Sequence, residues 1–342
     1  MTPEVRTAQS NPFAAPKSSP GHGTIHLALL PPNTPKLRTI NYQYPLKLVS
    51  PAPSRTESDQ SHLIHTVYLL TYGGGLVAGD AIDLHVILES ATRLILLTQG
   101  STKLFKSPGR EVLSKQSTTV TLAPGSALCY LPDPVQPFEK SNFRQRQVYN
   151  ISLPEWTSAT SASMCVLDWV SSGRPANGEN WSFYHYGSHN EVYLSHANGQ
   201  RKLLLRDNLL LDDQTLGDSV AHRMDGLAVY GTLILYGKLY MSLGQHFMSE
   251  FKLLPRIGGR KWDSGSDSGE DEVDPLAEKR AERHRSEAHG GVLWSAASVR
   301  GCVVVKFGAP VLEAARRWLH DMLAHEGTVV REFGQRSLLC LR

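Results

Sequence analysis

The sequence predicts a mostly-β protein, because strand-like segments follow one another from about residue 23 to residue 257 and clear helical periodicity comes only near the C-terminus. In Ile82–Leu88, apolar residues alternate with polar ones such as Asp83 and His85, which is the period of two of a half-buried strand. Apolar and β-branched runs recur between Gly, Pro and Asn turns, with few helices between them. This spacing argues against βαβ units.

The strands are predicted from these runs in chain order. The Asn198-Gly199 pair is the strongest hairpin signal, because both residues readily adopt the positive φ angles that a tight two-residue turn needs. The predicted strands are His62–Thr71, Ile82–Leu88, Thr92–Thr98, Glu111–Leu122, Arg144–Leu153, Trp181–His196, Lys202–Leu211, Leu227–Tyr236 and Cys302–Phe307.

One amphipathic helix is predicted over Pro310–Glu326, where apolar residues recur at steps of three and four. Pro310 suits the first helical position, and Gly327 suits the stop. Weaker helical patterns cover Gln214–Arg223 and Gln245–Leu254.

The chain is expected to form one β-rich domain over residues 23–342, preceded by a flexible arm over residues 1–22 that is rich in Pro, Ser and Gly. Residues 263–290 hold almost no large apolar side chain, and an acidic block there runs into a basic one. Such a segment buries too little surface to offset the entropy of ordering, so it is predicted to be a disordered insert.

Composition excludes several classes of protein. The 342 residues carry a net charge of only +3, so a strongly basic nucleic-acid-binding face is not predicted. No apolar run approaches the ~18 residues of a membrane span, and the N-terminus lacks the apolar core of a signal peptide. Four widely separated cysteines form no zinc pattern. We therefore expect a soluble intracellular protein.

The glycine-rich stretch Gly73–Gly79 admits two interpretations. As G-x-G-x-x-A after a strand it resembles a dinucleotide-binding loop, and this leaves an NAD(P)-binding oxidoreductase as an alternative function. That loop requires a helix next, whereas the following residues alternate at period two. A tight turn with positive φ angles accounts for the glycines without a nucleotide.

No catalytic constellation stands out. The sequence has no G-x-S-x-G elbow and no H-E-x-x-H motif, and no cysteine sits in a recognisable reactive setting. The residues alone therefore favour a non-enzymatic binding or scaffolding role, and a β-rich protein-binding module unrelated to any metal remains a further alternative.

Five segments together resemble one known family. They are Asn41–Leu48, which contains Y-P-L-K-L; Gly74–Asp80, with G-G-x-x-x-G-D; Leu97–Lys103, with T-Q-G-S-T-K; Tyr130–Phe138, with L-P-x-P-x-x-P-F; and Gly173–Glu179, with G-R-x-A-x-G-E. In this order and spacing they resemble the UreD/UreH family of urease accessory proteins. The charged segment 263–290 and the N-terminal arm depart from the family pattern.

The resemblance implies a fold, a role and partners. The fold it implies is an extended, mostly-β superhelix, similar to a β-helix, with a few helices near the C-terminus. The role is a cytoplasmic, non-catalytic chaperone for nickel insertion into urease. It would act in complex with UreF, the GTPase UreG and the urease apoprotein, as a dimer within the accessory complex. No tightly bound cofactor, nucleic acid or membrane is implied.

A nickel carrier needs weak ligands that release the ion again, and Ni²⁺ accepts carboxylate and imidazole groups. Asp80 and Glu179 both lie at glycine turns of the resembling motifs, where a carboxylate is able to face an interior passage. Ser101 lies beside Lys103 in another motif. These three are the candidate residues of a conduit for transient Ni²⁺. The alternative for each is turn capping or ordinary hydrogen bonding.

Overall fold

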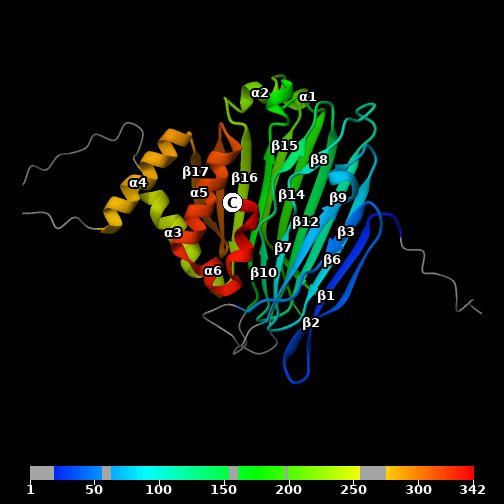
Figure 1. Ribbon diagram of the computed structural model, residues 1–342, viewed down its shortest axis with the longest axis vertical. Coiled ribbons are helices and arrows are strands. Elements are labelled where there is room, and N and C mark those ends of the chain that lie inside the picture. The colour runs from blue at the N-terminus through cyan, green and yellow to red at the C-terminus, as the bar shows by residue number, and fades with distance from the viewer. Residues whose placement is uncertain (1–18, 56–62, 154–160, 197–198, 255–274) are drawn as a thin grey trace, which may run out of the picture.

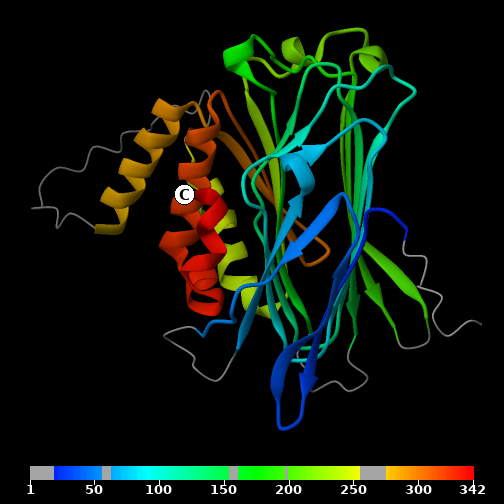
Figure 2. The same cartoon turned by 45° about the vertical axis from the view of Figure 1, so that its right-hand side comes forward.

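The computed structural model describes residues 19–55, 63–153, 161–196, 199–254 and 275–342. It has three layers, with a smaller sheet on one side, a larger sheet in the middle and helices against the outer face of the larger sheet (Figures 1 and 2). Most of the predicted arm and the acidic part of the predicted insert lie outside the described residues.

The smaller sheet has seven strands in the spatial order β15-β14-β12-β9-β6-β1-β2. Its inner strands are parallel, and an antiparallel hairpin closes each end. The hairpin predicted at Asn198-Gly199 is the β14–β15 pair, although Asn198 lies outside the described residues. The strands are β1 His22–Leu30, β2 Thr34–Tyr42, β6 Ala81–Leu88, β9 Ser114–Leu122, β12 Asn142–Ser152, β14 His185–Ser195 and β15 Arg201–Leu211.

The larger sheet has eleven strands, of which eight form the path β17-β18-β16-β13-β10-β7-β4-β3 and three short ones pair beside it. The path strands are β3 Leu46–Val49, β4 Ile64–Thr71, β7 Arg93–Leu97, β10 Ala127–Tyr130, β13 Ser163–Ser171, β16 Val229–Tyr236, β17 Leu293–Val299 and β18 Cys302–Ala309. The short strands are β5 Gly75–Leu76, β8 Thr102–Leu104 and β11 Val135–Pro137.

From β6 to β14, successive long strands alternate between the two sheets. Each strand therefore pairs in parallel with the strand that last entered the same sheet. The chain runs β6, β7, β9, β10, β12, β13 and β14, and β6, β9, β12 and β14 are parallel neighbours while β7, β10 and β13 are too. With 46% strand and 24% helix, the mostly-β prediction is confirmed. The two mixed sheets have open edges, and the expected extended superhelix is not confirmed.

The helical layer is built mainly by α3 (Met241–Lys252), α5 (Leu312–Glu326), α6 (Thr328–Phe333) and the C-terminal 3₁₀ segment Gln335–Leu341. Helix α5 begins two residues later than predicted, so Pro310 precedes it, and it ends as predicted at Gly327, which has φ 85°. The pattern predicted over Gln214–Arg223 becomes two single turns, α1 (Asp213–Leu216) and α2 (Val220–Arg223).

The prediction of disorder over residues 263–290 is wrong for its second half. Residues 275–290 form helix α4 (Pro275–Gly290), which packs against α3 and α5. Ion pairs attach this helix to α3, because Arg280 and Arg283 both contact the buried carboxylate of Glu250. These ion pairs join two segments distant in the sequence, so the pattern of residues 263–290 alone does not predict them.

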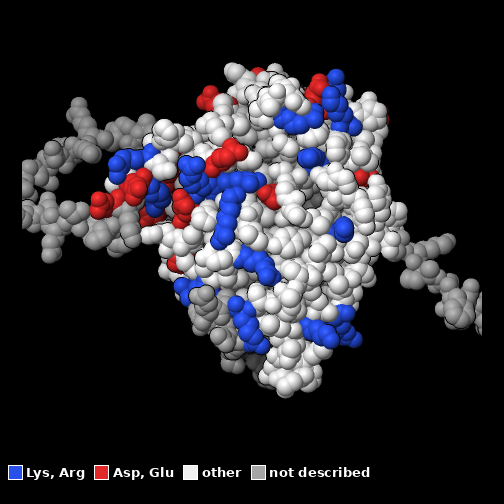
Figure 3. Space-filling model, in the orientation of Figure 1, with Lys and Arg blue, Asp and Glu red and all other residues white. Residues whose placement is uncertain are grey.

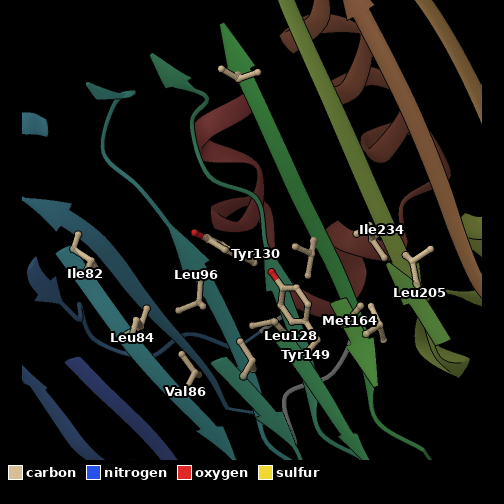
Figure 4. Packing of buried hydrophobic residues seen from close by; sticks show 14 of the residues in the cluster. Ile82, Leu84, Val86, Leu96, Leu128, Tyr130, Tyr149, Met164, Leu205 and Ile234 are labelled. Carbon is tan, nitrogen blue, oxygen red and sulfur yellow. The ribbon is translucent and has the colours of Figure 1, made fainter. Parts of the chain in front are cut away.

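Two apolar cores lie on opposite faces of the larger sheet. The core between the sheets contains alternate residues of β6 together with side chains from β7, β10 and β12, some of which Figure 4 shows. The core between the larger sheet and the helices is rich in aromatic rings, including Trp294, Phe307 and Trp318.

Candidate functional site

The five motif segments, which are scattered over about 140 residues, meet at one end of the larger sheet. Strand β5 pairs with β8, β8 with β11, and β11 with the end of β13, all in parallel. Tyr72 N–H donates to the carbonyl of Pro45, which ties the first segment to the glycine-rich stretch. The amide of Gln136 donates to the carbonyl of Gly173, which ties in the last. We call these short strands, β5, β8 and β11, the motif ladder.

The glycine-rich stretch is a turn between strands. After β5, a turn over residues 77–79 leads directly into β6, and no helix follows that would present its N-terminus to a pyrophosphate. Gly73 and Gly74 have φ angles of 72° and 74°, and a Cβ on Gly75 would come within 2.2 Å of the Lys103 carbonyl oxygen. The geometry therefore contradicts the dinucleotide-binding alternative and accounts for the glycines as turn and close-packing residues.

Asp80 holds this turn together. Its carboxylate accepts a hydrogen bond of 2.9 Å from the backbone N–H of Val77, and its own N–H donates to the Val77 carbonyl at 3.0 Å. The side chain is half-buried. One carboxylate oxygen of Asp80 is therefore used in capping the turn, and its other oxygen accepts no hydrogen bond from the described part of the chain.

Glu179 is buried and paired. Arg174 donates two hydrogen bonds to the carboxylate, one of 3.0 Å from Nε and one from Nη2, and its guanidinium stacks 3.8 Å from the centre of the Phe138 ring. The hydrogen bond from Arg174 holds the pKa of Glu179 below its ordinary value. The pair fixes the loop over 173–179 against the fourth motif segment.

Ser101 is half-buried immediately before β8. The register pairs Gly75 with Lys103, so Ser101 precedes the motif ladder, whereas Asp80 follows it. Glu179 adjoins β11, which lies two strand spacings from β5, roughly 10 Å away. The structure therefore distributes the three candidate residues around the motif ladder and does not gather them around one ion.

A cavity of about 40 Å³ lies between the two sheets, beside the motif ladder. Three motif segments contribute to its wall: the first through Leu46, the third through Thr98 and Thr102, and the fourth through Tyr130, Pro132, Asp133 and Val135. The volume is enough for about three water molecules. Its polar wall residues include Gln116, Gln145, Gln147, Asp133 and Asp168.

Asp168 is the buried carboxylate of this cavity. It accepts hydrogen bonds of 2.6 Å from the amides of Gln145 and Asn190, and one from the hydroxyl of Ser188. Burial raises the pKa of Asp168 above its ordinary value, and these hydrogen bonds only partly oppose that effect. Among described residues no cation pairs with Asp168, so its charge is balanced by dipoles alone.

Asp133 connects the cavity to the helical layer. One carboxylate oxygen accepts from the Thr98 hydroxyl at 3.0 Å and from the Gly100 N–H at 2.9 Å. The other accepts from Arg316 of α5 at 2.7 Å. A movement of α5 would therefore act through Asp133 on the first half of the third motif segment, which contains both Thr98 and Gly100.

Asp133 and Asp168 were not predicted as site residues from the sequence. The sequence did hold a signal for Asp168, because it is the one charged residue in the run Ser163–Ser171. In the structure all nine residues of this strand are buried. A carboxylate in such a strand requires a buried polar partner or a ligand. The partners come from β12 and β14, whose positions beside β13 no local pattern reveals.

A second, larger cavity of about 540 Å³ lies among α3, α4 and α5. Glu250, with Arg280 and Arg283 paired to it, lies on its wall, and so does His246, whose pKa is lowered by burial. Charged side chains gather over this helical side of the molecule, whereas the sheets show few on the face seen in Figure 3. Among the described residues, no helix is long and apolar enough to cross a membrane.

Comparison with known proteins identifies relatives over most of the chain. The family described as UreD urease accessory protein matches residues 21–338. The chain is 28% identical to "Urease accessory protein 4" of Cryptococcus neoformans var. grubii over 96% of each protein. It is 31% identical to an "Uncharacterized urease accessory protein ureD-like" of Schizosaccharomyces pombe, over 81% of this chain and 84% of that one. It is 32% identical to "Urease accessory protein D" of Arabidopsis thaliana, over 57% and 61%.

Proposed function

The chain belongs to the UreD family of urease accessory proteins, and from this premise we propose that it is a non-catalytic chaperone scaffold for inserting nickel into the urease active site. The main support for the proposal is the polar cavity between the sheets. Part of its wall is formed by the segments that resemble the family. Its donors are carboxylate, amide and hydroxyl oxygens.

Oxygen donors suit a carrier rather than a store. Thiolate and multiple imidazole ligands hold late transition ions tightly, whereas a few oxygen ligands with water let a borderline ion such as Ni²⁺ exchange. We propose that Asp80, Ser101 and Glu179 flank the route of the transient ion around the motif ladder and that Asp168 faces it inside. For Glu179 to meet the ion, Arg174 must first release it.

The partners proposed for this role are UreF, the GTPase UreG and the urease apoprotein, with two copies of this chain in the accessory complex, in the cytoplasm. The chain needs no nucleic acid, membrane or resident cofactor for this role. The link from Arg316 to Asp133 supports coupling between the helical layer and the cavity, because a partner that shifts α5 would disturb the cavity wall.

Deletion of the gene tests the role as a whole. Urease purified from cells without this protein is expected to be inactive and poor in nickel, and restoring the full chain is expected to return both. Fully active, nickel-replete urease in the deletion strain would contradict the proposal and leave a β-rich binding protein with a different partner.

The conduit residues are tested by the double substitution Asp80→Ala and Glu179→Ala. We expect the nickel content of urease to fall at least several-fold while the circular dichroism of the purified variant stays that of the wild type. The matched control is the double substitution Glu111→Ala and Glu313→Ala, which removes two exposed carboxylates elsewhere. Equal nickel content in both variants would remove Asp80 and Glu179 from the route. If the first double variant misfolds, Asp80→Asn with Glu179→Gln takes its place.

A further inference from the structure

A second group of metal-binding side chains lies on the outer face of the smaller sheet, away from the cavity. His22 on β1 and Asp83 and His85 on β6 place one nitrogen or oxygen atom each within 4.8 Å of one another. We propose that these three residues bind a divalent transition ion of the Zn²⁺ and Ni²⁺ class, with water in the remaining coordination positions.

Strand pairing brings the three together. Strands β1 and β6 run in parallel with His22 opposite Asp83 and Thr24 opposite His85. Side chains alternate between the faces of a sheet, and the neighbours Gly23, Ile82 and Leu84 are buried toward the core. The side chains of the three proposed ligands therefore all point to the outer face, where they are partly open to water.

The distances suit coordination after small side-chain rotations. His85 Nε2 lies 3.2 Å and His22 Nδ1 lies 3.8 Å from the same oxygen, Oδ2 of Asp83. Ligand atoms around a tetrahedral Zn²⁺ ion are about 3.4 Å apart. Two imidazoles and one carboxylate form a common donor set for zinc when the site keeps a position open to water.

Thr24 orients one of the ligands. Its hydroxyl lies 3.3 Å from Nε2 of His22. When Nε2 carries the proton it donates to this oxygen, and Nδ1 is left with the lone pair that a metal ion needs. Such a partner to the second nitrogen is the usual accompaniment of a metal-binding histidine.

The charge of Asp83 is not taken up elsewhere. Within the described part of the chain, its ion-pair contacts are with the two histidines alone. On the neighbouring strand β9, the residues in register with Asp83 and His85 are Ser117 and Thr119, which bring no cation. An ion with two positive charges would therefore meet a carboxylate and two imidazoles without a competing Lys or Arg directly opposite them on β9.

The same two strands provide a matched control. Further along, His26 contacts Glu89 at 2.9 Å, and a backbone N–H from Leu29 takes the other carboxylate oxygen. This pair has one imidazole rather than two, and its carboxylate is already shared with the backbone. It is expected to contribute little to metal affinity.

The test is a titration of the purified full-length chain with Zn²⁺ in competition with a chromogenic chelator, repeated with Ni²⁺. Because the chain has 14 histidines, the readout is the loss of one site from the stoichiometry rather than binding as such. His22→Ala and His85→Ala are each expected to weaken that site at least 100-fold, Thr24→Val about 10-fold, and His26→Ala not at all.

Unchanged titrations of His22→Ala and His85→Ala would overturn the proposal, as would an equal loss in His26→Ala. If an alanine variant does not fold, Asp83→Asn decides, because it keeps the shape of the side chain and removes the charge; unchanged binding there contradicts the site. Urease takes no part in the measurement, so failure of the nickel-delivery proposal leaves this result unaffected.

Discussion

The cores packed against the two faces of the larger sheet differ in character. Between the sheets, the apolar core surrounds a cavity with the buried carboxylate of Asp168, which is held by hydrogen bonds alone. Between the sheet and the helices, aromatic rings pack closely, and the buried carboxylate of Glu250 is held by two arginines. The first arrangement leaves the carboxylate of Asp168 without a cation and able to bind a ligand. In the second, the two arginines neutralise the charge of Glu250.

The two carboxylates show this difference in their pKa values. Burial would raise the pKa of both. For Asp168 burial prevails and the pKa is raised, with the nearby Asp207 adding to the effect. For Glu250 the ion pairs with Arg283 and Arg280 outweigh burial, and the pKa is lowered. A buried carboxylate with a raised pKa and no cation is typical of a functional position, and one with a lowered pKa in an ion pair is typical of a structural one.

The largest expected effect comes from breaking the aromatic core. The ring of Trp318 lies 5.2 Å from that of Phe307, and its Nε1 donates to Glu287. Trp318→Ala is expected to lower the free energy of unfolding by about 3–5 kcal/mol, measured by urea denaturation. Val311→Ala, at an exposed site beside the same helix, should change it by less than about 0.5 kcal/mol. A loss below about 1 kcal/mol for Trp318→Ala would show that the helices add little stability.

Removing one arginine of the ion-paired group is expected to cost somewhat less. Arg283 contacts both Glu250 at 2.6 Å and Glu287 at 3.1 Å. Arg283→Ala leaves Arg280 to neutralise Glu250, so we expect about 3 kcal/mol, the lower end for a broken buried pair.

The pH dependence of stability checks the role of this pair. Because the folded-state pKa of Glu250 is lowered, its contribution is present above the ordinary glutamate pKa and is lost as pH falls through the folded value. In Arg283→Ala, the free energy of unfolding should fall much less than in the wild type as the pH is lowered. An unchanged acid profile would contradict the ion pair as its cause.

The smallest effect is expected from Asp168→Asn, which keeps the shape and removes the charge. The asparagine oxygen can still accept from Ser188 and Asn190, and Gln145 faces the new amide after a flip that gives up its hydrogen bond to Ser188. The free energy of unfolding at neutral pH should therefore change by no more than about 1 kcal/mol. The raised folded-state pKa of Asp168 makes its stabilising contribution present below the ordinary aspartate pKa and lost as pH rises through the folded value. The variant should lack that decline. If the free energy of unfolding of wild type and variant changed equally with pH, Asp168 would not be the cause of this decline.

Local pattern predicted nine of the eighteen strands of the described residues and one hairpin, but not the parallel pairings. The predicted segments 82–88 and 202–211 agree with β6 and β15 to within a residue, because alternation and turn residues act over a few positions. Which strands become neighbours depends on the alternation of the chain between two sheets. Helix α4 was missed for a related reason, since its ion pairs are with α3, more than twenty residues earlier.

The candidate sites show the same division. The motifs drew attention to Asp80 and Glu179, but not to the turn capping by Asp80 or to Arg174 as the partner of Glu179. The group of His22, Asp83 and His85 was not predicted, because His22 lies sixty residues before the other two and meets them only through the parallel pairing of β1 and β6.

The alternation of strands between the sheets also has a consequence for how the chain acquires its structure. Parallel neighbours such as Leu84 and Thr118, or Thr118 and Gln147, are separated by roughly thirty residues, so each pairing must close a long loop before it gains any contact. Folding dominated by such pairings is slow, and it leaves sheet edges open to other chains in the meantime. Newly made protein should therefore be most prone to aggregation before the last strands and helices are in place, and early contact with a partner would protect it.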